Sequence, residues 1–238
     1  MAAALAVAVA IPASADSLVV NNPENHPYFG ARVSIDISSS ANGGRYYSSK
    51  PGFAVGAVYN IPVWKNLYFE PGLSVFYDVF GTTYFNIETI QIPDISSETG
   101  YIDKDVMYQV DGSIRNLGFR IPLNIGYHFD FAEDLRVSVF TGPQFNASVV
   151  ARYHQDAYTK PSGAKEASFS KSAFGTGGFK HFDAQWNFGV GLDWENYTVA
   201  LTGSVGMTRL RDAIVYAPGV VQPKTRRNLF AITLGYNF

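Results

Sequence analysis

Two histidines each precede an aspartate by two positions, in a polar stretch that also contains several serines. His154 is followed by Asp156, and His181 is followed by Asp183. A histidine beside a carboxylate can act as a general base, and a nearby hydroxyl can then serve as the nucleophile of a hydrolase. Closeness along the chain is not triad geometry, so we predict no catalytic residue and keep an enzyme that modifies lipid or peptide as an alternative. The hydroxyls near these pairs belong to Ser168, Ser170 and Ser172.

The sequence contains little evidence for other kinds of catalytic or binding site. The 238-residue chain has four histidines and no cysteine, which excludes disulfides, thiol nucleophiles and zinc sites built on cysteine. No glycine-rich phosphate loop occurs between a strand and a helix. The net charge of −2 argues against a nucleic-acid partner. We therefore predict no metal and no cofactor.

Several segments of the chain alternate like β-strands, and a second set of polar residues lies on one face of these segments. Its charges could form a gate or a proton path, or they could be a structural polar core that fills a narrow barrel, and we favour the filled core. Buried ions should pair, and we expect Glu70 to pair with Arg120. The predicted polar network of the lumen comprises Arg32, Asp36, Glu70, Asp78, Arg120, Asn124, Arg136, Gln144, Asp183, Gln185 and Asp193.

Most of the remaining basic residues lie in the long connections. Such cations can neutralise the phosphates of an outer-leaflet glycolipid, although long loops are polar by default. The predicted glycolipid contacts are Arg209, Arg211, Arg226 and Arg227.

Strands that alternate between two faces must position all of these side chains. One face of the alternation carries large apolar residues and no charge, whereas the other carries the charges and most of the strand glycines. The eight segments are 28–37, 53–61, 67–79, 117–127, 135–149, 183–194, 197–208 and 229–238.

The glycine-rich face decides which side is inside. On a surface exposed to water, glycine weakens a strand and offers no side chain to shield its backbone. The crowded axis of a small barrel, in contrast, needs small residues. The apolar face then points outward into lipid, where a charge near mid-membrane would cost about 2–4 kcal/mol. We predict an all-β fold, an eight-stranded antiparallel transmembrane β-barrel with up-and-down meander topology. A soluble ligand-binding β-barrel is the alternative.

The connections divide the chain further. We predict a signal peptide at 1–15, a polar lead at 16–27 and the barrel at 28–238. Long external loops are expected at about 38–52, 80–116, 150–182 and 209–228, alternating with short turns. The second of these loops could extend its strands as a hairpin whose edge adds a strand to a partner.

The chain ends in LFAITLGYNF, an alternating strand that closes on an aromatic residue. Together with YFEPGLSV, LGFRIPLNIGYHF, VSVFTGPQF and FGVGLDW, this ending resembles the PorT-like outer-membrane β-barrel domain, a relative of OmpA/OmpX-type barrels. The resemblance implies a place in the bacterial outer membrane, and an assembly signal at Tyr236 and Phe238 read by the barrel-assembly machinery. It implies no established chemistry.

These observations predict a non-enzymatic outer-membrane protein with a structural, adhesion or accessory-assembly role. Its expected partners are outer-membrane lipids, the assembly machinery and an envelope or surface protein. A conducting pore is disfavoured, because eight strands leave an interior that side chains fill.

Overall fold

The structure is a computed structural model that describes residues 26–41, 47–93, 100–132, 134–159, 163, 165–175, 178–211, 214–217, 220–222 and 224–238. The predicted signal peptide at 1–15 and all but the last two residues of the polar lead at 16–27 lie outside these ranges. Among the described residues, no helix is long and apolar enough to cross a membrane.

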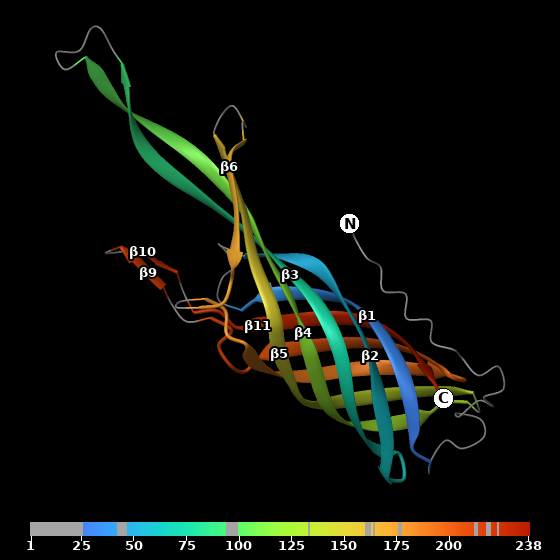
Figure 1. Cartoon of the computed structure of the whole chain (residues 1–238). Coiled ribbons are helices and arrows are strands. Elements are labelled where there is room, and N and C mark those ends of the chain that lie inside the picture. Colours follow the sequence, from blue (N-terminus) through green and yellow to red (C-terminus); the bar gives the residue numbers. More distant parts are fainter. Residues whose placement is uncertain are drawn as a thin grey trace.

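Eight strands close into a ring, in which each strand is antiparallel to both neighbours (Figure 1). The first and last strands close it, with Ala31 opposite Tyr236 and Val33 opposite Leu234. This arrangement confirms the predicted eight-stranded meander. The ring consists of β1 (Tyr28–Ser40), β2 (Tyr47–Trp64), β3 (Leu67–Pro93), β4 (Tyr101–Asp130), β5 (Leu135–Thr159), β7 (Phe182–Trp194), β8 (Tyr197–Gly206) and β11 (Arg227–Asn237).

The two ends of the barrel differ. At one end two-residue turns join β2 to β3 and β7 to β8, and their first residues, Lys65 and Glu195, adopt φ values of 47° and 51°. At the other end β3, β4 and β5 continue beyond the ring, and β6 (Lys165–Ser172) adds to β5. A separate pair, β9 (Ile214–Ala217) and β10 (Val220–Gln222), lies at the same end of the barrel (Figure 1).

The four predicted long loops all contain strand residues. Residues 80–116 form a hairpin that stays paired as far as Pro93 and Tyr101. Residues 38–52 contain the ends of β1 and β2, 150–182 contains the end of β5 and β6, and 209–228 contains β9, β10 and the start of β11. Within these segments Phe80, Ile114, Ala151, Phe179 and Leu210 are buried in one hydrophobic cluster.

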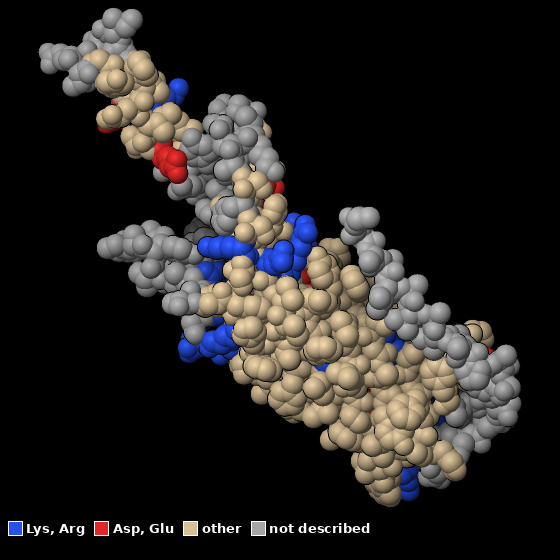
Figure 2. Space-filling model, viewed as in Figure 1, with Lys and Arg blue, Asp and Glu red and all other residues tan. Residues whose placement is uncertain are grey.

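The outer wall of the ring is apolar, and Figure 2 shows it almost free of charged atoms. Phe188 is 54% exposed, Val33 52% and Leu234 60%. No residue predicted for the outward face is buried. The orientation predicted from the glycine-rich face is therefore confirmed.

The inward glycines make room for aromatic rings. A Cβ at Gly126 would fall on the ring of Tyr68, which faces it on the neighbouring strand. A Cβ at Gly189 would meet the ring of Phe140 in the same way. Small and large residues thus alternate around the axis, as a narrow barrel requires.

Candidate functional site

Two arginines occupy the lumen near the end where the strands extend. Arg120 belongs to β4, and Arg227 is the first residue of β11. Arg227 is fully buried and Arg120 is 5% exposed. An unpaired charge in such a place would be costly, so each arginine needs acidic partners.

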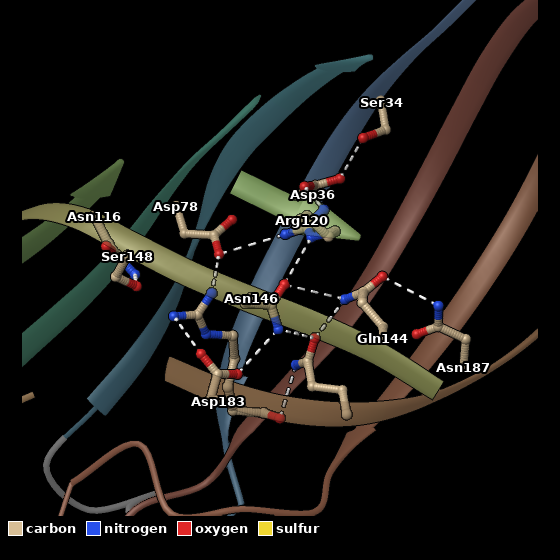
Figure 3. Close-up of polar contacts among 12 residues, drawn as sticks. Ser34, Asp36, Asp78, Asn116, Arg120, Gln144, Asn146, Ser148, Asp183 and Asn187 are labelled. Atoms are coloured by element: carbon tan, nitrogen blue, oxygen red, sulfur yellow. Dashed lines mark hydrogen bonds and ion pairs between the residues drawn. The ribbon is translucent and has the colours of Figure 1, made fainter. Parts of the chain in front are cut away.

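Three aspartates supply these partners (Figure 3). Arg120 Nη1 lies 2.6 Å from Asp36 Oδ2, and Arg227 Nη2 lies 3.2 Å from Asp183 Oδ1. Asp78 bridges the two arginines, because its Oδ2 is 3.5 Å from Arg120 Nη2 and 3.0 Å from Arg227 Nη1. Strands from opposite sides of the ring are therefore tied together through one charged cluster, which we call the lumen cluster.

Aromatic rings cover the same arginines. The guanidinium carbons of Arg120 and Arg227 lie 5.0 Å and 5.2 Å from the ring centroid of Phe76, and Arg227 also lies 5.9 Å from Phe80. Both rings are almost wholly buried. Cation–π contacts within about 6 Å are favourable, so the rings stabilise charge as well as filling volume.

An amide layer lies beside the lumen cluster (Figure 3). Asn146 accepts from Arg120 Nε at 3.2 Å and donates to Asp183 at 3.0 Å. Gln144 donates to Gln185 at 2.6 Å and accepts from Asn187 at 3.1 Å. These bonds join the neighbouring strands β4, β5 and β7 on their lumen side and satisfy groups that would otherwise be buried without partners.

The turn end of the lumen holds a second set of polar pairs. Arg32 Nη2 lies 3.7 Å from Glu70 Oε2, and Thr198 donates to Asp193 at 2.5 Å. Between this end and the lumen cluster lies a cavity of about 130 Å³. It is lined on the turn side by Tyr68, whose ring stacks on His128 at 4.1 Å.

The arrangement therefore fills the lumen with paired charges. Side chains from six of the eight ring strands meet in the lumen cluster and the amide layer. Side chains thus fill the interior at this level, as expected for a barrel of eight strands.

A family model described as the outer membrane protein beta-barrel domain matches residues 26–210, which is more than half of the chain. The chain belongs to this family. The barrel accordingly lies in the outer membrane of a bacterium, with its apolar wall in the lipid.

Comparison with solved structures gives similar barrels at low identity. Neisserial surface protein A is 10% identical over 89% of this chain and 97% of that chain, with a TM-score of 0.37. The attachment invasion locus protein Ail of Yersinia pestis is 9% identical over 90% and 99%, with a TM-score of 0.32. The N-terminal β-barrel domain of Pseudomonas aeruginosa OprF is 13% identical over 88% and 97%, with a TM-score of 0.31. No curated protein matches the chain.

The barrel places the predicted polar residues inside, but the one ion pair predicted among them does not form. The pairing of Glu70 with Arg120 was wrong, since the register sets Ser74 opposite Arg120 and Asn124 opposite Glu70. Arg136 lies at the turn end, 3.0 Å from Asp130. The other predicted members are buried or half-buried, namely Arg32, Asp36, Glu70, Asp78, Arg120, Asn124, Gln144, Asp183, Gln185 and Asp193.

Arg227 corrects a second prediction. It was expected to contact glycolipid, but its side chain is fully buried in the lumen cluster. Its position continues the inward parity of Leu229 and Ala231, a signal the sequence contained. Of the other predicted glycolipid contacts, Arg209 and Arg226 are exposed and Arg211 is half-buried.

Of the histidine pairs considered from the sequence, the one on β5 lies beside β6, where the register sets Ser170 opposite His154 and Ser168 opposite Asp156. His154 Nε2 lies 3.6 Å from Asp156 Oδ2. His181 Nδ1 instead contacts the Ser148 carbonyl at 3.0 Å, while the neighbouring Asp183 pairs with Arg227. In the same part of the chain, no group of three or more histidine, aspartate or glutamate side chains could hold a metal.

Proposed function

We propose that this protein is a non-enzymatic outer-membrane barrel of the PorT-like kind, whose filled lumen anchors an external sheet that binds an envelope or surface protein. The observation that carries the proposal is the β3–β4 hairpin, which projects well beyond the ring (Figure 1). A connection that only closed the barrel would need a few residues. The hairpin is therefore an interaction element.

The hairpin offers an open edge to a partner. The β2–β3 pairing ends at Thr82, whereas β3 continues to Pro93 with β4 along one edge. Along 83–93, no strand of the described residues pairs with the other edge of β3. Unpaired backbone N–H and C=O groups can add a strand from another protein.

The tip of the hairpin adds apolar surface for such a partner. Ile90 is 37% exposed, Tyr101 54% and Ile102 41%. The register sets Ile92 opposite Ile102, so that the two isoleucines share a face with Ile90. Backbone pairing would supply affinity, and these side chains would supply specificity.

The barrel itself serves as the anchor. The filled lumen argues against a pore, and Asp183 is bound to Arg227 in the lumen, which leaves His181 without that carboxylate as a catalytic partner. For biogenesis, the assembly machinery would read the C-terminal strand through Tyr236 and Phe238. Their rings pack edge-to-face 5.1 Å apart, and the Phe238 N–H donates to Phe29 at 2.8 Å.

The test removes the hairpin and keeps the barrel. Replacing residues 84–110 with Asn-Gly joins Thr83 to Asp111, which face each other across the pair. The shortened protein should still reach the outer membrane and keep its heat-dependent mobility on a denaturing gel. In cells lacking the native gene, it should fail to restore surface attachment and cell–cell association, which the full-length protein restores.

Full restoration of attachment and association by the shortened barrel would refute the interaction role and leave only a structural one. The matched control replaces Lys171 and Ser172 at the end of β6 with alanine, which leaves the hairpin intact. That control should behave as the full-length protein.

A further inference from the structure

The projecting part of the β3–β4 hairpin has two different faces. Residues that lie directly opposite each other on neighbouring strands point to the same side of a sheet, and successive residues of one strand alternate between the two sides. One side, which we call the acidic face, consists of three such pairs: Thr89 with Asp105, Gln91 with Asp103 and Pro93 with Tyr101.

The opposite side of the hairpin is mainly aliphatic. We call it the apolar face, and it consists of the pairs Ile90 with Lys104, Ile92 with Ile102 and Glu88 with Val106. Its acid and its base are opposite in sign, so this face has no net charge. A partner on the apolar face is therefore recognised by aliphatic contact rather than by charge.

The acidic face has a net negative charge. Asp103 and Asp105 are both exposed, and none of the six residues of this face is basic. Thr89 Oγ1 donates to Asp105 Oδ1 at 2.7 Å, which holds this carboxylate against β3. Figure 2 shows acidic atoms on the projecting hairpin, whereas basic atoms gather at the rim of the barrel. The acidic face is therefore complementary to a cationic partner.

A strand added to the open edge of β3 would meet both faces at once. Its side chains on the acidic face would lie beside Thr89 and Gln91, with Asp105 and Asp103 one strand further away, about 10 Å from the added backbone. A lysine or arginine can lay its long stem across β3 and bring its charge to these carboxylates. Alternate residues of a strand are about 7 Å apart, so two basic residues separated by one position match the spacing of Asp103 and Asp105.

An aromatic ring at the tip adds to the preference for a cation. Tyr101 is 54% exposed and lies on the acidic face, two residues before Asp103. A basic side chain bound at Asp103 can also lie over this ring, and such cation–π contacts are favourable. On the other side of the added strand, side chains would meet Ile90 and Ile92, which favour aliphatic residues.

We propose that the hairpin edge receives an amphipathic basic strand of its protein partner, in which lysine or arginine alternates with aliphatic residues. The basic residues lie on the acidic face, and the aliphatic residues lie on the apolar face. This inference rests on the proposed function, because it specifies the chemistry of the segment that pairs with the open edge of β3. Backbone pairing then supplies affinity, and the charge of one face selects the partner.

The test measures peptide binding by fluorescence anisotropy, with the full-length protein in nanodiscs of phosphocholine lipid. The probes are labelled peptides of about nine residues, a usual strand length, in which valine alternates with lysine, with glutamine or with glutamate. A fourth peptide is the lysine–valine peptide with proline at its centre. The variants are Asp103→Asn, Asp103→Asn/Asp105→Asn and the shortened barrel that lacks residues 84–110. The matched control is Glu88→Gln, which removes an exposed acid from the apolar face.

We expect the lysine–valine peptide to bind the full-length protein and not the shortened barrel. Asp103→Asn should weaken this binding about threefold and the double variant about tenfold, whereas Glu88→Gln should bind as wild type. The glutamine–valine peptide should bind the wild type about tenfold more weakly than the lysine–valine peptide, and the glutamate–valine peptide more weakly still. The proline peptide should not bind, because proline removes an N–H group that strand addition needs.

The inference is overturned if the lysine–valine peptide binds the wild type no better than the glutamine–valine peptide. The proposed function survives that result if both peptides still bind the full-length protein and not the shortened barrel, because the edge then adds strands without regard to charge. Equal binding of every peptide by the full-length and shortened proteins contradicts the proposed function as well. A loss in Glu88→Gln as large as in Asp103→Asn would replace the acidic face with a diffuse charge effect. Unchanged heat-dependent gel mobility in every variant shows that the barrel has folded.

Discussion

Replacing Arg227 with methionine should destabilise the barrel more than almost any other single change. The substitution keeps a long unbranched side chain, but it removes the cation that lies 3.0 Å from Asp78 and 3.2 Å from Asp183. Three buried aspartates would then share Arg120 as the cation of the lumen cluster. Water cannot screen this imbalance, because Arg227 is fully buried.

Breaking a buried ion pair by removing one partner typically costs about 3–5 kcal/mol. We expect Arg227→Met to lose that much free energy of unfolding. Arg226→Met is the matched control, because Arg226 is the preceding residue and is exposed. It should stay within about 0.5 kcal/mol of wild type in bilayers that contain no charged lipid.

The assay is reversible urea unfolding in phosphocholine vesicles, followed by the fluorescence of the three tryptophans. The slope of the transition should be unchanged, so that the midpoint reports stability. Adding Asp183→Asn to Arg227→Met restores the charge balance and should recover about 1–3 kcal/mol. The reasoning is refuted if Arg227→Met unfolds within 0.5 kcal/mol of Arg226→Met, or if Asp183→Asn lowers stability further.

Three further predictions use the same unfolding assay. Glu70→Gln should lower the free energy of unfolding by less than about 1 kcal/mol, because the ion pair between Arg32 and Glu70 is long and partly exposed. Arg120→Met should lower it by about 3–5 kcal/mol. Equal losses in the two variants would contradict this ranking. Val190→Arg should cost about 2–4 kcal/mol, whereas a negligible loss would mean that this position does not face lipid. Gly126→Val should cost about 1–3 kcal/mol, because its Cβ would overlap the ring of Tyr68; a stability equal to wild type would show that the ring moves freely.

The sequence was sufficient for the orientation of the wall. Phe188, Val190 and Leu192 alternate with Gly189 and Gly191, and only a closed barrel in lipid accounts for large apolar groups on one side and glycine on the other. The same alternation identified Asp36, Asp78, Arg120 and Asp183, which are four of the five charged members of the lumen cluster. Both inferences depend on a period of two, which any strand imposes on its residues.

The sequence was insufficient for the pairings. Alternation shows which face of its strand a residue occupies, but it does not show which residues lie opposite each other on neighbouring strands. That register depends on the turns and on shifts such as the one between Leu117 and Gly118. Glu70 and Arg120 share the lumen but lie four positions apart in register. Arg227 was missed because the predicted strand began at Leu229, although Arg227 has the same parity.

The orientation of the apolar wall is tested most directly by photolabelling the unmodified protein in vesicles whose acyl chains carry a diazirine. Mapping the adducts by mass spectrometry should place them on outward residues of β7 and β8, such as Val190, Leu192 and Leu201. Adducts on Gln185, Asn187 or Ser204, with Val190 and Leu201 unlabelled, would contradict it.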